Sequence, residues 1–175
     1  MRAMWMAALA VWSLGAAQAA PIDVAPLKVS LEAQAKFDED YGAQELRYLE
    51  RTLRTQIERE LKSRGADLAK DGYVLEVELL GAKPSRPTFQ QLGARTYLDF
   101  ARSRSLGGAE FQARFLRPDG SMVREFTYKW YETDLRFSFG QSTWYDAQRA
   151  IDFFSRKVGQ AYTASIDGLN GSQAS

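Results

Sequence analysis

Cysteine and histidine are both absent from the sequence. Without cysteine the chain has no disulfide framework and no residue that could be lipidated after secretion. The two absences together exclude Ser-His-Asp and Cys-His nucleophiles and nearly all zinc, copper and haem ligation. An enzyme made from this chain would have to use Asp, Glu, Tyr, Lys or a Ser-Lys pair, and no spacing points to one. The sequence therefore favours a non-enzymatic protein with no catalytic residue, metal site or cofactor.

Phosphate-binding and nucleotide-binding motifs are also missing. The chain contains no Walker loop, dinucleotide fingerprint or G-x-S-x-G elbow, and no repeat of solenoid period. Its charges are balanced, with 23 Lys plus Arg against 22 Asp plus Glu. This balance argues against nucleic acid or an anionic membrane as the partner of the whole molecule, although a local patch is compatible with it. We expect no nucleic-acid partner.

The longest apolar run lies at the N-terminus. Arg2 precedes the run at residues 3–17, which ends in the small-x-small pattern at residues 17–19 that signal peptidase cleaves. The run is shorter than the roughly 20 residues that span a bilayer. The pattern predicts a signal peptide over residues 1–19 and a periplasmic or secreted protein with no membrane span after cleavage. An uncleaved N-terminal anchor is the alternative.

Beyond the signal peptide, the length is that of one domain. Arg2 is the only charged residue in the first 19 positions, so cleavage leaves equal numbers of basic and acidic residues. The last nine residues are small, polar and glycine-containing. The sequence predicts a single domain over residues 20–166 and a flexible tail over residues 167–175.

A β-hairpin is predicted for residues 109–132. Apolar and polar residues alternate on both sides of residues 117–121, where Pro118 and Gly120 supply the backbone angles of a turn. Alternation also predicts strands over residues 27–37 and 73–79. In the second of these, two glutamates fall on the solvent-facing side.

Two helices are predicted from apolar residues spaced three and four apart. The first covers residues 43–64 and the second begins at the capping pattern of residues 143–146. Three acids at residues 38–40 are expected to cap the first helix, because carboxylates stabilise a helix N-terminus. A calcium loop is the alternative, but its alternating ligands are lacking. The order of elements predicts an α+β fold: two helices packed on one face of a mainly antiparallel sheet of about four strands, in the order β-α-β-β-β-α.

The segment 81–108 is longer than a connection between two strands requires. It holds five basic residues and one acid, Asp99, in a chain that is otherwise close to neutral. Arginine forms forked hydrogen bonds with carboxylate and phosphate, so the segment is a candidate anion-binding loop. The alternative is a flexible, solubilising loop whose arginines pair with acids of the first helix. Residues 96–100 are expected to add a short strand.

Aromatic residues concentrate after the hairpin. Such a cluster could form a stacking platform for sugar or peptide, or could belong to the core and its rim. Its members are Trp130, Tyr131, Phe137, Phe139, Trp144 and Tyr145. Combined with the basic segment, the predicted ligand- or partner-binding residues are Lys83, Arg86, Arg95, Arg102, Arg104, Trp130 and Tyr131.

The order of elements resembles that of small bacterial envelope proteins, including the lipopolysaccharide-assembly lipoprotein of the outer membrane and several families of domains of unknown function. The resemblance spans the chain after the signal peptide and rests on no diagnostic motif, so it carries over no functional residue. This chain lacks the acylated cysteine of those lipoproteins, and the resemblance does not imply outer-membrane anchoring here.

Two functional hypotheses follow, beside the possibility of a purely structural fold with interchangeable surfaces. The first is a periplasmic binding or envelope-assembly module that holds an anionic envelope component or a partner protein through residues 83–104. The alternative is a carboxylate-dependent hydrolase of envelope glycan, with the aromatic cluster as sugar platform and acids such as Glu132 and Asp134 beside it.

Overall fold

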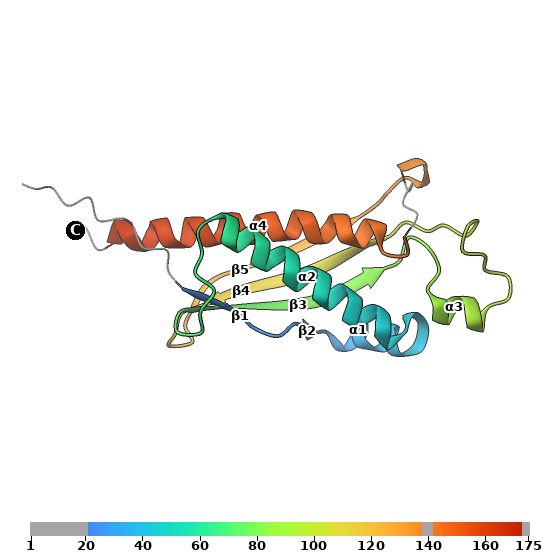
Figure 1. The fold of residues 1–175 in the computed structure, drawn as a ribbon, viewed down its shortest axis with the longest axis horizontal. Coiled ribbons are helices and arrows are strands. Elements are labelled where there is room, and N and C mark those ends of the chain that lie inside the picture. Colours follow the sequence, from blue (N-terminus) through green and yellow to red (C-terminus); the bar gives the residue numbers. More distant parts are fainter. Residues whose placement is uncertain (1–20, 138–141, 173–175) are drawn as a thin grey trace, which may run out of the picture.

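The computed structural model describes residues 21–137 and 142–172. The predicted signal peptide at residues 1–19 and Phe139 lie outside the described residues. Within them the chain forms one five-stranded sheet covered by helices (Figure 1). No helix in the described part is long and apolar enough to cross a membrane.

The sheet is mixed and has the strand order β1-β3-β4-β5, with β2 also pairing β3. β1 and β2 run parallel to β3, whereas β3 pairs with β4 and β4 with β5 in antiparallel fashion. The strands are β1 Ile22–Val24, β2 Lys28–Val29, β3 Tyr73–Lys83, β4 Gly108–Leu116 and β5 Met122–Tyr131. The predicted hairpin is confirmed, and Gly120 has the positive φ, +82°, that its turn requires.

Two long helices cover one face of this sheet (Figure 1). They are α2, Ala43–Ser63, and α4, Tyr145–Ser172. In α2 the predicted stripe buries Leu49, Leu53, Ile57 and Leu61. In α4 the ring of Phe154 stacks on Phe111 of β4, with 4.8 Å between ring centroids. The predicted α+β class, with two helices on one face of a sheet, is confirmed. The sheet has five strands where about four were expected, and the element order differs from β-α-β-β-β-α because β1, β2 and α1 all precede α2.

The other face of the sheet carries ion pairs. Lys28 Nζ lies 2.6 Å from Glu76 Oε1, and Arg114 Nη2 lies 3.5 Å from Glu78 Oε2. Lys129 and Glu110 form a third pair across β4 and β5 at 2.9 Å. The two glutamates on the polar side of β3 are therefore partners of cations on neighbouring strands, as residues on a wet face of a sheet usually are.

The predicted strand over residues 27–37 is wrong beyond Val29. Ser30 instead caps the short helix α1, Leu31–Lys36, by accepting a hydrogen bond from the Ala33 N–H at 3.2 Å. A single π-helical turn, η1 Phe37–Tyr41, follows. The apparent alternation of this stretch coincides with a run of strong helix formers, and the cap decides the conformation.

Two other expectations need correction. Residues 96–100 form turns and irregular loop, so the short strand predicted there is wrong. No side chain caps α2, whose N-cap is Gly42, so the acids at residues 38–40 do not have the capping role expected of them. The helix α4 continues to Ser172, into the range predicted as a tail. The described part also contains three further elements that the sequence pattern did not reveal: the strand β1, the helix α3, Phe89–Ala94, and the 3-10 turn η2, Leu135–Phe137.

Candidate anion-binding site

Four of the five basic residues of segment 81–108 line one pocket. The pocket has a volume of about 260 Å³ and lies where η1, α3 and the loop after α3 meet. Its basic residues are Lys83, Arg86, Arg95 and Arg104, and Asp40 is the acid among its lining residues. The fifth basic residue, Arg102, is exposed and does not line it.

A capping box fixes the start of α3. The Gln91 N–H donates to Thr88 Oγ1 at 3.2 Å, and the Thr88 N–H donates to Gln91 Oε1 at 3.1 Å. Thr88 is buried, so this cap also joins α3 to the body of the molecule. The local signal, a threonine followed three residues later by glutamine, was readable in the sequence.

Arg86 forms a wall of the pocket and organises the loop beyond it. Its side chain is buried, and its Nη1 donates to the carbonyl oxygens of Phe100 and Ala101 at 2.9 Å each. The guanidinium also lies 5.8 Å from the centroid of the Phe100 ring. A residue predicted to bind ligand thus has a structural role, while its positive charge stays beside the pocket.

Asp40 partly neutralises the pocket. Arg95 Nη2 lies 2.7 Å from Asp40 Oδ1, and Gln91 Nε2 donates to Asp40 Oδ2 at 3.0 Å. These contacts attach α3 to η1. Of the acids expected to cap α2, Asp40 instead holds the arginine of another segment.

Lys83 and Arg104 supply the charge that remains available. Both are exposed, and neither has an ion-pair partner among the described residues. Long side chains in this position can turn toward a bound anion without first breaking a salt bridge. The pocket therefore combines a fixed guanidinium, Arg86, with two side chains free to close on a ligand.

Trp130 and Tyr131 lie outside this pocket and do not form a common platform. Trp130 packs near Phe153 of α4 and has the Arg149 guanidinium 4.7 Å from its ring centroid. Tyr131 points to the opposite face of β5, on the side of Lys129. Burial raises the pKa of Tyr131 to about 12, with smaller contributions from the negative charge of Glu110 and other groups.

Trp144 belongs to the core. Its ring stacks on Phe37 with centroids 5.7 Å apart, and its Nε1 donates to Glu45 Oε2 at 2.6 Å. The Phe137 side chain lies outside the described atoms. For Trp144 the structure supports the core interpretation of the aromatic cluster.

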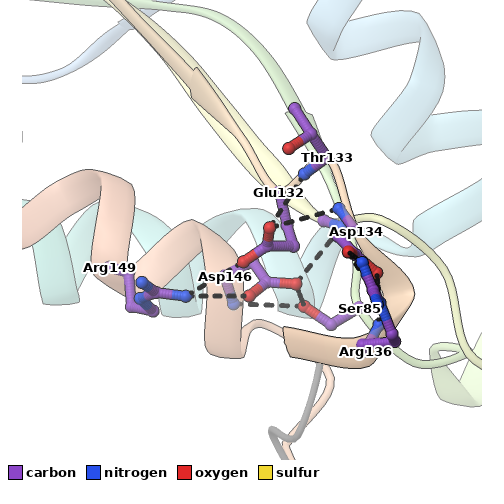
Figure 2. A network of polar contacts seen from close by, with 8 residues as sticks. Ser85, Glu132, Thr133, Asp134, Arg136, Asp146 and Arg149 are labelled. Atoms are coloured by element: carbon purple, nitrogen blue, oxygen red, sulfur yellow. Dashed lines mark hydrogen bonds and ion pairs between the residues drawn. The ribbon is translucent and has the colours of Figure 1, made fainter.

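A buried polar network beside the pocket was not predicted (Figure 2). Asp146, in the first turn of α4, is fully buried, and its Oδ2 accepts hydrogen bonds from Ser85 Oγ at 2.8 Å and the Gly107 N–H at 3.3 Å. The Asp146 N–H donates to Ser85 Oγ at 3.1 Å. Arg149 links this carboxylate, at 4.0 Å, to Glu132, at 3.2 Å. The network joins both ends of the basic segment to the start of α4.

The acids named for the hydrolase hypothesis are held in place by nearby groups. Glu132 Oε1 accepts hydrogen bonds from the N–H groups of Thr133 and Asp134 at 2.9 and 3.3 Å. Arg136 Nη2 donates to Asp134 Oδ2 at 2.6 Å, and this hydrogen bond holds the pKa of Asp134 below its usual value. A general acid needs the opposite shift, so Asp134 is suited to an ion pair rather than to proton donation.

Comparison with known proteins leaves this site unassigned. No family model and no curated protein matches the chain. A minor lipoprotein of Acinetobacter baumannii is 16% identical over 82% of this chain and 92% of its own, with a TM-score of 0.37. A Xanthomonas campestris protein of the family DUF330 is 14% identical over 88% of each chain, with a TM-score of 0.43. Likeness at these TM-scores carries no argument about function.

Proposed function

We propose that the protein is a non-enzymatic binding module of the bacterial cell envelope, and that it holds an anionic group in the pocket lined by Lys83, Arg86, Arg95 and Arg104. The observation that carries this proposal is the convergence of four basic residues, spread over 22 positions of sequence, on one pocket with a single acid among its lining residues. The expected signal peptide supports the envelope as its location.

The size and chemistry of the pocket favour a small anionic group. Its volume of about 260 Å³ is below the roughly 300–1,000 Å³ typical of sites for drug-sized ligands. A phosphate or carboxylate group of a larger molecule fits such a space. Arginine and lysine bind these groups by charge-assisted hydrogen bonds, which are stronger than neutral ones.

The proposal is tested by calorimetric titration with inorganic pyrophosphate as the probe. We expect the double variant Lys83→Gln/Arg104→Gln to bind at least tenfold more weakly, because each charge-assisted contact contributes about 1.5–3 kcal/mol. Both side chains are exposed, so the melting temperature should stay close to that of the parent protein.

A charge-matched control is Arg59→Gln/Lys70→Gln. Both of these residues are exposed and lie outside the pocket, yet the variant loses the same two positive charges. It should keep the parent affinity. An equal loss of affinity in the two double variants would show that pyrophosphate binding depends only on the net charge of the protein. That result would contradict the proposed site.

A further inference from the structure

Three aromatic rings are exposed on the segment that contains the pocket. Phe89, Tyr97 and Phe100 have 86%, 79% and 42% of their surface exposed. They belong to residues 88–104, which we call the tip and which projects beyond the end of the sheet in Figure 1. A single exposed apolar residue is ordinary; here three of them lie within 12 positions of one projection.

The tip holds these rings in solvent through ordered hydrogen bonds. The capping box of Thr88 sets Phe89 at the first position of α3. Asp99 Oδ1 accepts hydrogen bonds from the N–H groups of Ala101 and Arg102 at 2.8 Å each, and Arg86 binds the carbonyl groups of Phe100 and Ala101. The backbone that carries the exposed rings is thus fixed by hydrogen bonds.

The same surface is basic. Arg102 and Arg104 of the tip, and Lys83 shortly before it, are exposed and have no ion-pair partner in the part of the chain that the structure describes. The acid of this segment, Asp99, is occupied by backbone N–H groups. On its other side, Phe89 lies beside Arg47 and Arg51 of α2, which are also exposed, and near the acid Glu45, whose Oε2 accepts a hydrogen bond from Trp144 Nε1.

We propose that the tip docks on an anionic phospholipid bilayer, with Phe89 and Tyr97 in the interfacial layer and the surrounding cations on lipid phosphates. The inference rests on the proposed function, because the basic residues of the pocket would contact the lipid phosphates. It adds the aromatic rings as apolar anchors in the bilayer. Interfacial binding combines buried aromatic rings with attraction between basic side chains and anionic lipids. The charge of the tip is complementary to that of such a bilayer.

The shape of the tip favours a bilayer over a protein partner or a second copy. A stable protein interface buries about 800 Å² on each side and has a contiguous apolar centre. Here the rings are separate: Phe89 borders α2, whereas Tyr97 and Phe100 lie on the loop after α3. Separate rings on a projection, with cations between them, suit a layer of headgroups that surrounds each ring.

The absence of cysteine allows the docking surface to be located directly. A polarity-sensitive thiol dye is attached to Phe89→Cys, to Tyr97→Cys and, as control, to Met122→Cys in the otherwise unchanged protein. Met122 is 53% exposed and lies in the hairpin at the end of the molecule away from the tip (Figure 1). With phosphatidylglycerol vesicles, we expect a blue shift and brighter emission at positions 89 and 97 and no change at position 122.

Vesicle sedimentation gives the second measurement. We expect Phe89→Ser/Tyr97→Ser to lose about tenfold or more in affinity for phosphatidylglycerol vesicles, since each ring would no longer be buried in the interface. Its affinity for pyrophosphate should not change. Every variant carries the same N-terminal segment, so that segment contributes equally to all of them.

Three outcomes would overturn the inference. These are dye emission at positions 89 and 97 that does not respond to vesicles, an equal response to pure phosphatidylcholine, and a response to protein concentration alone, which would indicate a second copy. If pyrophosphate still bound in those cases, the proposed function would stand without the membrane. If the parent protein bound phosphatidylglycerol vesicles but did not bind pyrophosphate, only the proposed site would be overturned.

Discussion

Asp146 is the residue on which the geometry of the basic segment depends most. Its side chain is fully buried, and it accepts hydrogen bonds from the Ser85 hydroxyl and the Gly107 N–H, at the two ends of the segment (Figure 2). A buried donor that loses its acceptor cannot turn to water. Removing this one carboxylate should therefore affect both ends at once.

We predict that Asp146→Ala lowers the free energy of unfolding by about 2–4 kcal/mol, because it leaves two buried donors unsatisfied. Urea unfolding measures the change. Asp152→Ala is the matched control, since Asp152 is exposed on the same helix, and should stay within about 0.5 kcal/mol of the parent. Equal stability of the two variants would show that the network does not hold the fold.

Single residues were the hardest part of the site to predict. The sequence pointed to the basic residues of segment 83–104, and four of the five line one pocket. It did not reveal that Arg86 holds carbonyl groups of the loop, because nothing local distinguishes a ligand-binding arginine from a structural one. The contact between Ser85 and Asp146 joins residues 61 positions apart and has no local signature.

At the scale of elements, the sequence predicted those with two different faces. The helix α2 and the β4–β5 hairpin showed clear periods of 3.6 and 2, and both formed as expected. The prediction failed for α1, where alternation competed with a serine cap, and for α3, which is too short to show a period. The parallel pairing of β1 with β3 could not be predicted, because it depends on partners about 50 residues apart.

Gly42 connects η1 to α2 in a backbone conformation that disfavours other residues. Its φ is +103°, and a Cβ there would meet the Gln90 side chain at 3.2 Å. We predict that Gly42→Ala lowers the free energy of unfolding by about 1–2 kcal/mol, mainly through backbone strain. Thermal unfolding measures it as a lower melting temperature.

Gly93→Ala is the comparison for this prediction. Gly93 lies within α3, and an added Cβ would meet no atom within 4 Å. Alanine should stabilise the helix by up to about 1 kcal/mol. The two glycine variants should thus shift the melting temperature in opposite directions, and shifts of the same sign would contradict the assigned conformations.

At the scale of the whole molecule, buried tyrosines link stability to alkaline pH. Burial raises the pKa of Tyr41 in η1, of Tyr128 and Tyr131 in β5, and of Tyr162 in α4. A phenol whose pKa is higher in the folded state contributes stability that is complete below its unfolded pKa. That contribution disappears as the pH rises through the folded pKa.

We predict that the free energy of unfolding falls from about pH 10 upward, the range between the unfolded pKa of tyrosine and the value of about 12 for Tyr131. In Tyr131→Phe the fall should be shallower. Tyr97→Phe, which changes a ring that is 79% exposed, should follow the parent curve. Urea unfolding across this pH range provides the measurement, and identical curves for Tyr131→Phe and the parent would refute the assignment.

The parallel pairing of β1 with the beginning of β3 places the start of the described chain at the end of the molecule away from the tip. Ile22 lies opposite Tyr73, and α4 starts beside Ser85 and runs away from the tip to Ser172, so the described chain begins and finishes at the end remote from α3 (Figure 1). A sensor chip or a fused reporter attached at the end of α4 would therefore present the tip outward, which makes oriented immobilisation straightforward.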